Sequence, residues 1–305
     1  MRFPDNARVC FIGDSLTAQN QILPRVIDHY NKHFSQANVR FFNCGTSGGT
    51  YKTAIEFFYD DVLVHNPTHA VVAFGVNDSN RWALEWGRGK QTYDNLKAYY
   101  ENFKKEVKIY CEMLKEHNID FVICTPAPYD EYSETDVVAS KGGFALIAEY
   151  ANVVRAFAKE NNLPLCDHHA FLTEQLQIDS EPIISHDHVH PVPHGYYLMA
   201  KNFLAFQGLE IDPEADIPEY LNKWREEVQK LRLVYGTEQM VIHNYKMPLE
   251  EKVKLIKEKI KTENWGNAAF EPFIRGFDAI GFKKDEQYKI IDDVYEQDVF
   301  NHYGK

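Results

Sequence analysis

The sequence predicts an α/β fold in which a parallel β-sheet is covered by helices on both faces. Short apolar runs rich in Val, Ile, Phe and Cys recur along the first part of the chain. Longer polar stretches with helical periodicity separate these runs. The chain has 305 residues, of which 44% are hydrophobic, so it can bury a sizeable core. This alternation of strand and helix is typical of an open parallel sheet.

The apolar runs are bounded by Gly, Pro or Asn and predict buried strands over residues 8–13, 39–43, 69–75, 119–125 and 163–167. Helical periodicity is clearest over 93–117 and 143–161, and a further helix is expected over 193–206. In such a sheet the ligand crevice lies beyond the carboxyl ends of the strands. The segments that follow the strands should therefore carry the chemistry.

The pattern changes near residue 212, where charged helical stretches begin and no convincing strand follows. We therefore expect a sheet domain over 1–211 and a helical extension over 212–305. The extension contains many large apolar side chains, whose burial needs a partner surface. We expect it to pack on the sheet domain or to join two copies of the chain in a homo-oligomer.

Composition narrows the classes of partner. The formal net charge is −12, which argues against binding to nucleic acid or anionic lipid. No apolar run approaches the roughly 18 residues of a membrane-spanning helix, and the N-terminus lacks the apolar core of a signal peptide. We therefore expect a cytoplasmic protein. The five cysteines form no CxxC pair, and an odd number is a poor disulfide framework. Cys10, Cys44 and Cys124 lie within apolar strand-like runs, where buried free thiols are expected.

Four segments in the sheet domain carry candidate chemistry: GDSL at 13–16, NCGTSGG at 43–49, GVND at 75–78 and HDHVHP at 186–191. Each segment alone is also explained by a turn glycine, a strand end or a helix cap. The first three follow expected strands and the last lies near the end of the sheet domain, so all four should meet at one edge of the sheet.

Together these segments supply every part that serine acyl chemistry needs. Ser15, on a strand-to-helix turn, would expose a nucleophilic hydroxyl and donate its own N–H to an oxyanion. Gly45 would offer a second backbone N–H and Asn77 a side-chain amide. His190 is the expected general base, and Asp187, three residues earlier, would orient its imidazole.

This constellation resembles the SGNH, or GDSL, hydrolases, whose four motif blocks bear Ser, Gly, Asn and His in this order, with DxxH in the last block. The resemblance covers about residues 5–207. It implies a flavodoxin-like five-stranded sheet in the order 2-1-3-4-5 and hydrolysis of esters or thioesters through an acyl-enzyme, without metal or other cofactor. His188 stands where the family often has a small residue, and it is a possible substrate contact.

Three other classes stay open. The H-x-H spacing of HDHVH, with His168 and His169, is compatible with a zinc hydrolase. A nucleotide-binding module also begins with a strand, a turn and a helix, but the chain lacks GxGxxG there and Asp14 would repel a pyrophosphate. A catalytically inactive binding protein is the third alternative. Within the resembling family, a lipase or thioesterase is an alternative to an esterase.

Aromatic side chains near the expected site favour a small or carbohydrate ester as substrate. Trp82 and Trp86 follow the Asn77 segment, with Arg81 and Arg88 beside them, and ordinary helix packing explains them equally well. Tyr129 and Tyr132 follow the fourth expected strand. Aromatic faces with polar neighbours suit a sugar better than a long acyl chain, so an acetyl group on a carbohydrate is expected. The predicted substrate contacts are Asp14, Trp82, Trp86, Tyr129 and His188.

Overall fold

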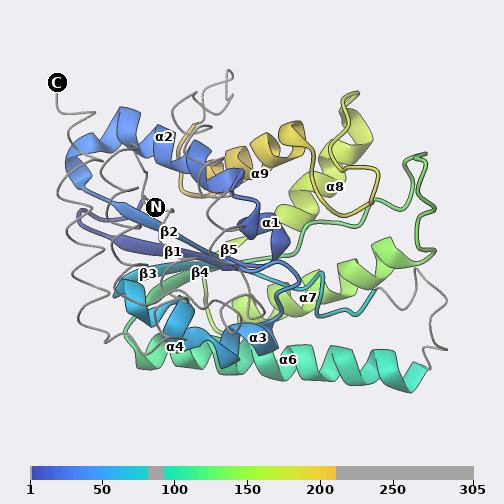
Figure 1. Ribbon diagram of the computed structural model, residues 1–305, viewed down its shortest axis with the longest axis horizontal. Helices are drawn as coiled ribbons and strands as arrows, with labels where there is room; N and C mark the ends of the chain where they lie inside the picture. Colours follow the sequence, from blue (N-terminus) through green and yellow to red (C-terminus); the bar gives the residue numbers. More distant parts are fainter. Residues whose placement is uncertain (1, 82–92, 211–305) are drawn as a thin grey trace, which may run out of the picture.

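A computed structural model describes residues 2–81 and 93–210; residues 1, 82–92 and 211–305 lie outside the described residues. Its centre is a five-stranded parallel sheet in the order β2-β1-β3-β4-β5, as predicted (Figure 1). The strands are β1 (Arg8–Gly13), β2 (Arg40–Gly45), β3 (His69–Ala73), β4 (Asp120–Cys124) and β5 (Leu165–Cys166). The predicted helical extension falls outside the described residues.

Helices cover both faces of this sheet (Figure 1). One face carries α1 (Ser15–Ala18), α2 (Ile22–Phe34), α8 (His168–Ile178) and α9 (Pro193–Phe206). The other face carries α3 (Tyr51–Glu56), α4 (Phe58–Asp61), α6 (Tyr93–Glu116) and α7 (Gly143–Glu160). The described residues also form two short 3₁₀ turns, η1 (Ser35–Ala37) and η2 (Leu63–His65). Helix α9 packs on both α2 and α8, and α6 packs on both α3 and α7.

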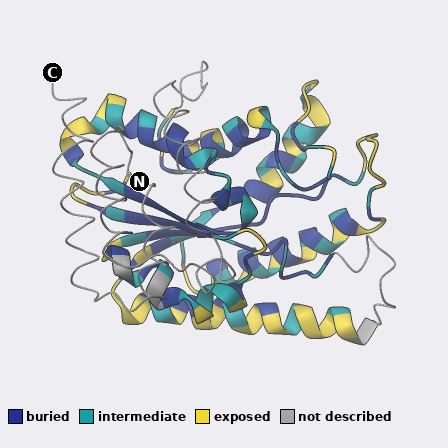
Figure 2. Cartoon of the chain, viewed as in Figure 1, coloured by how far each residue is buried: buried dark blue, intermediate teal, exposed yellow. Residues whose placement is uncertain are grey.

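The sheet is buried on both sides, as Figure 2 shows by its dark strands. Val9 and Cys10 of β1 and Val72 of β3 have no exposed surface, which explains why these strands are continuously apolar in sequence. All five cysteines are buried free thiols, which confirms the burial expected for Cys10, Cys44 and Cys124. In the part of the chain that the structure describes, no helix has the length and apolar character needed to cross a membrane.

The bounds of helix α8, which follows the fifth strand, were not predicted from the sequence. Asp167 caps it by accepting a hydrogen bond from the N–H of Ala170 at 3.0 Å. The same carboxylate accepts from the Arg155 guanidinium at 2.7 Å and from the Thr125 hydroxyl at 2.9 Å. A tertiary network that joins α7, the end of β4 and α8 therefore fixes where this short helix begins.

The strand register brings the predicted site segments together. Gly13 at the end of β1 pairs with Gly45 at the end of β2 and with Ala73 at the end of β3. The segments that follow these three strands consequently leave the sheet side by side at its carboxyl edge.

Candidate active site

The turn after β1 holds Ser15 at the first position of helix α1. A Cβ at Gly13 would lie 2.2 Å from the Thr17 Oγ1 atom and 2.7 Å from the Ala73 carbonyl oxygen, so the turn requires glycine there. The Asp14 side chain caps the helix by accepting from the Leu16 N–H at 2.9 Å. Glycine and cap together place the Ser15 hydroxyl at the carboxyl edge of the sheet.

The Ser15 hydroxyl meets an imidazole and a carboxylate from the segment before α9. The Nε2 atom of His190 lies 2.8 Å from the Ser15 Oγ atom. The Nδ1 atom of His190 lies 2.6 Å from the Asp187 Oδ2 atom. A carboxylate on Nδ1 keeps a hydrogen on that nitrogen and leaves the Nε2 lone pair facing the serine. A hydroxyl whose proton can pass to an imidazole in this way can attack an ester carbonyl.

Asp187 is itself held by the loop over residues 185–191, here called the histidine loop. Its Oδ1 atom accepts from the N–H groups of Val189 and His190 at 3.0 and 2.9 Å, and from the Ser185 hydroxyl at 2.8 Å. Partial burial by itself would raise the pKa of Asp187, but the hydrogen bonds from His190, Val189 and Ser185 outweigh it and lower this pKa below its ordinary value. The carboxylate is therefore charged at neutral pH.

In the segment after β2, the N–H of Gly45 does not have the role predicted for it. The N–H of Gly45 donates to the Asn43 Oδ1 atom at 2.9 Å, so this hydrogen already has an acceptor within the protein. A Cβ at Gly45 would lie 2.4 Å from the Ala18 nitrogen, which shows that this glycine permits the close approach of α1 to β2. Gly45 therefore has a packing role in this structure and not the predicted free donor.

Gly48 is the glycine in this segment that offers an unused N–H. Its φ angle is +72°, and a Cβ built on it would meet no atom within 4 Å. The described residues include no acceptor for its N–H, nor for the N–H of Ser15. The Asn77 side-chain amide donates to the carbonyl oxygen of Gly49, the residue after Gly48, at 3.1 Å. An amide has two hydrogens, so Asn77 keeps one donor for a ligand beside the Gly48 turn.

Three of the predicted substrate contacts are buried, and the other two, Trp82 and Trp86, lie outside the described residues. Asp14 is 3% exposed and caps α1. Burial raises the pKa of Asp14 to about 6, against the opposing effects of the Leu16 N–H and the charges of His190 and Arg81. This carboxyl is buried in the turn over residues 13–16, here called the serine turn, and does not lie on a substrate surface.

Tyr129 and His188 are also enclosed. The Tyr129 hydroxyl accepts from the Ser140 N–H at 2.7 Å, and its ring lies 5.8 Å from the His188 ring. His188 is 1% exposed, and both of its ring nitrogens lie against backbone carbonyl oxygens. By contrast, Tyr132 is 77% exposed. Of the aromatic residues predicted after β4, Tyr132 is thus the one available to a ligand.

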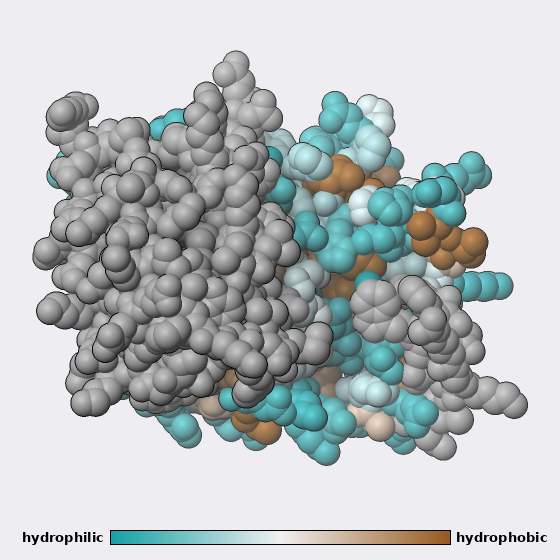
Figure 3. Space-filling view, viewed as in Figure 1, coloured by the Kyte–Doolittle hydropathy of each residue, from teal (hydrophilic) through white to brown (hydrophobic). Residues whose placement is uncertain are grey.

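Tyr129 and Tyr132 belong to the segment over 129–138, here called the rim segment, which follows β4. Its exposed apolar members are Tyr132, Val137 and Val138. Figure 3 shows a small brown patch at the right edge of the molecule, where Figure 1 places the segment after β4. The rim segment thus presents apolar surface beside the histidine loop, to which it is hydrogen-bonded.

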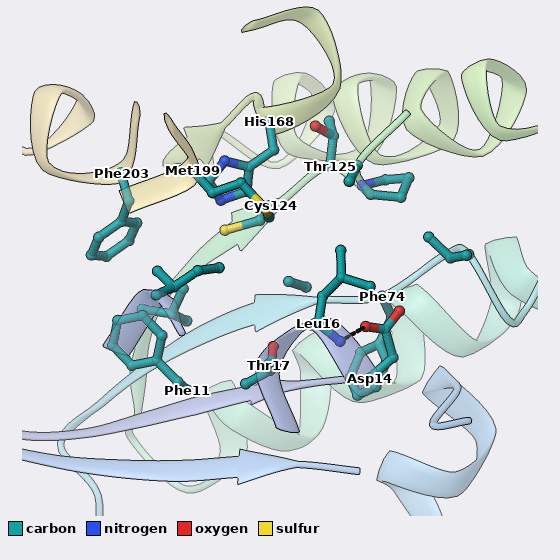
Figure 4. Close-up of a pocket in the computed structure, with 16 residues that line it drawn as sticks. Phe11, Asp14, Leu16, Thr17, Phe74, Cys124, Thr125, His168, Met199 and Phe203 are labelled. Atoms are coloured by element: carbon teal, nitrogen blue, oxygen red, sulfur yellow. Dashed lines mark hydrogen bonds between the residues drawn. The ribbon is translucent and has the colours of Figure 1, made fainter. Parts of the chain in front are cut away.

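A small cavity lies behind the serine turn (Figure 4). Its volume is about 30 Å³. Its lining is mainly apolar and includes Leu16, Phe74, Met199 and Phe203. The Asp14 carboxylate lies at one side of the cavity, and Cys124 and His168 lie at the other (Figure 4). A space of this size holds water rather than an acyl chain.

Within the described ranges, the group of side chains that could hold a metal ion is Cys124, Cys166 and His168, whose ligand atoms lie within 4.8 Å of one another. The sequence analysis did not identify it, although Cys124 and Cys166 are register partners on β4 and β5. The predicted H-x-H set does not converge, because the rings of His188 and His190 are hydrogen-bonded to different partners. The geometry therefore does not assemble the zinc site considered from the sequence.

An α/β sheet whose first strand leads through a turn to a serine, with the serine in contact with a histidine and the histidine with a carboxylate, defines the class of serine hydrolases. Residues 11–198 match the model of the GDSL-like Lipase/Acylhydrolase family, and the chain belongs to this family. It is a carboxylic ester hydrolase. The resemblance found in the four motif segments is thereby confirmed.

Several characterised proteins are similar to this chain. An acetylxylan esterase from Geobacillus stearothermophilus is 25% identical over 227 residues, which cover 69% of this chain and 98% of that enzyme. A crystal structure of a catalytic mutant of an acetylxylan esterase from the same organism has a TM-score of 0.58 at 22% identity, again over 69% and 98% of the two chains. A gut microbial diltiazem-metabolizing enzyme has a TM-score of 0.57 at 27% identity, over 68% of this chain and 48% of its own.

Proposed function

We propose that this esterase removes short acyl groups, acetyl above all, from a carbohydrate, and that it works through an acyl-enzyme on Ser15. The observation that carries the mechanism is the continuous contact from Ser15 through His190 to Asp187. His190 takes the hydroxyl proton as Ser15 attacks the carbonyl carbon and then delivers it to the leaving alcohol. Water repeats the sequence on the acyl-enzyme and releases the acid.

The charge that develops on the carbonyl oxygen needs donors that are already in place. We assign these donors to the N–H of Ser15, the N–H of Gly48 and the side-chain amide of Asn77. Two observations support Gly48 in place of Gly45: the N–H of Gly45 is bonded to Asn43, and the amide of Asn77 is anchored on Gly49. Asp187 stabilises the imidazolium that forms on His190 during both steps.

A carbohydrate ester is supported by the acetylxylan esterase relative, which is matched over 98% of its length. The exposed ring of Tyr132 on the rim segment offers an apolar face of the kind on which a sugar ring can lie. These features favour an acetylated sugar over the substrates of a lipase or a long-chain thioesterase.

Substrate profiling tests this proposal. The purified full-length chain is assayed with p-nitrophenyl esters of two, four, eight and twelve carbons, with acetyl-CoA, and with acetylated xylo-oligosaccharides. We expect kcat/KM to be highest for acetyl esters and to be raised further by the sugar. A maximum at eight or twelve carbons, or on the thioester, would replace the proposal by the lipase or thioesterase alternative.

A further inference from the structure

The histidine loop is fastened to the rim segment through His188. The Nδ1 atom of His188 lies 2.7 Å from the Asp130 carbonyl oxygen, and the Asp130 N–H donates back to the His188 carbonyl oxygen at 3.0 Å. The Nε2 atom lies 2.8 Å from the Val137 carbonyl oxygen. The Thr135 hydroxyl lies 3.0 Å from the same Nε2 atom and donates to the His186 carbonyl oxygen at 3.1 Å. The His188 imidazole therefore contacts residues near both ends of the rim segment, Asp130 and Val137.

The backbone of His188 is constrained as well. Its φ angle is +66°, in the left-handed region that a histidine seldom occupies. Such a conformation persists where the surroundings hold it, and here the ring contacts Tyr129 and two carbonyl oxygens. The conformation turns the chain between Asp187 and His190. The ring bonds therefore act on the part of the loop that presents the carboxylate and the imidazole.

The remaining hydrogen bonds of the histidine loop shape it internally. The Ser185 N–H donates to the His190 carbonyl oxygen at 2.7 Å, and the His188 N–H donates to the Ser185 carbonyl oxygen at 2.9 Å. Such bonds keep the loop folded, but they do not place it relative to the sheet. The His188 ring connects the loop to the rim segment, which follows β4 after residues 125–128.

We propose that His188 is a positioning residue for ester hydrolysis, which fixes the Asp187–His190 pair against Ser15 by anchoring the histidine loop to the rim segment. This inference rests on the proposed role of His190 and replaces the substrate contact expected from the sequence. The serine and the imidazole stand on separate segments, so their 2.8 Å contact depends on such an anchor. A misplacement of about 1 Å between reacting groups can cost on the order of a hundredfold in rate.

The test compares three substitutions at one position. His188→Gly keeps the left-handed backbone accessible and removes the ring bonds. His188→Asn also tolerates this backbone, but its short amide cannot reach both carbonyl oxygens. His188→Ala removes the ring and strains the backbone. The matched control is His186→Ala, because His186 is exposed in the same loop.

Each variant is assayed for kcat and KM on p-nitrophenyl acetate, for the rate of labelling by a fluorophosphonate, and for melting temperature. The low-field proton resonance of the His190 Nδ1–H, which the 2.6 Å contact with Asp187 should produce, is followed by NMR. We expect His188→Gly and His188→Asn to lose about 10- to 100-fold in kcat and in labelling rate, with KM within about twofold of wild type. Their low-field resonance should broaden or shift, and His186→Ala should match wild type in every measurement.

Two results would overturn the inference. If His188→Gly and His188→Asn both had a lower melting temperature with unchanged kcat and labelling rate, His188 would contribute to stability and not to positioning. A raised KM with unchanged kcat would restore the substrate contact predicted from the sequence. Failure of the proposed mechanism gives a separate result, because Ser15→Ala would then keep its activity whatever the outcome at His188.

Discussion

The Nε2 atom of His190 lies 2.8 Å from the Oγ atom of Ser15, although 175 positions separate the two residues in sequence. The carboxyl ends of the parallel strands make this contact possible, because the turn after β1 and the loop before α9 both reach the same edge of the sheet. The chemistry proposed for this chain depends on that distance and on the Asp187 carboxylate behind the imidazole.

Removing the carboxylate should slow turnover without abolishing it. In Asp187→Asn the amide can donate to Nδ1 of His190 and so favours the tautomer with hydrogen on Nε2, which cannot accept the serine proton. We expect kcat to fall by at least about 100-fold, and we expect a greater loss in His190→Ala. Steady-state kinetics on p-nitrophenyl acetate measures both. The assignment of base and orienting acid would be wrong if Asp187→Asn were the more damaged of the two.

Substitutions at Asn77 and Gly45 should distinguish donation to the oxyanion from the packing of α1 on β2. Asn77→Ala should lower kcat by about 100- to 1,000-fold with little change in melting temperature, as the loss of one such donor does. Gly45→Ala should instead lower the melting temperature, because its Cβ would lie 2.4 Å from the Ala18 nitrogen. Kinetics and thermal unfolding of both variants check this division. A stable Gly45→Ala variant with a large loss of kcat would return the donor role to Gly45.

Asp78 should make stability depend on pH. Burial raises its pKa to about 7 from 3.8, against the opposing hydrogen bond from the Tyr51 N–H. Between these values the folded state binds more protons than the unfolded state, so this group's contribution to stability is complete below about pH 4 and is lost as pH rises through about 7. Each pKa unit corresponds to about 1.4 kcal/mol.

Asp78→Asn removes this titration and keeps an acceptor for the Tyr51 N–H, which Asp78 binds at 2.8 Å. The free energy of unfolding of the variant, relative to wild type, should therefore increase from pH 4 to pH 8 in urea titrations. Asp136→Asn is the control, because Asp136 is exposed. A difference that stays constant over this range would contradict the assignment.

Tyr132 should contribute to sugar binding rather than to the chemical step. Tyr132→Ala is expected to raise KM for acetylated xylo-oligosaccharides about tenfold and to leave kcat and the KM for ethyl acetate unchanged, because the exposed ring would contact the sugar and not the acyl group. Tyr99→Ala provides the control, since Tyr99 is also exposed but lies on α6. Equal effects on the two substrates would exclude the sugar contact.

The parallel sheet and the meeting of Ser15, His190 and Asp187 could be predicted from local patterns, whereas the strand order followed from the resemblance that the four motif segments carry. Apolar strand runs, the serine turn and the Asp-x-x-His spacing are each visible within a few residues of sequence. The bounds of helix α8 could not be predicted in this way. Its start depends on Asp167 being held by Arg155 and Thr125, which are distant in sequence.

The exact donor among the glycines and the substrate contacts also depended on tertiary structure. In NCGTSGG the N–H of Gly45 is bonded to Asn43 and the N–H of Gly49 to the Thr46 carbonyl oxygen, and neither bond is visible in the sequence. Tyr and His side chains combine an apolar ring with polar atoms, so the sequence does not show whether Tyr129 and His188 lie at the surface or in the interior beside polar partners. Their burial follows from the Ser140 N–H and from the rim carbonyl groups that meet their polar atoms.

The central claim is that Ser15 is the nucleophile of an acyl-enzyme. The most direct measurement treats the full chain and its Ser15→Ala variant with a fluorophosphonate, then locates the adduct by peptide mass spectrometry. The account predicts one stoichiometric adduct on Ser15, complete loss of esterase activity on labelling, and neither adduct nor more than about a thousandth of wild-type activity in the variant. An adduct on another residue, or a Ser15→Ala variant that keeps more than a tenth of the activity, would contradict it.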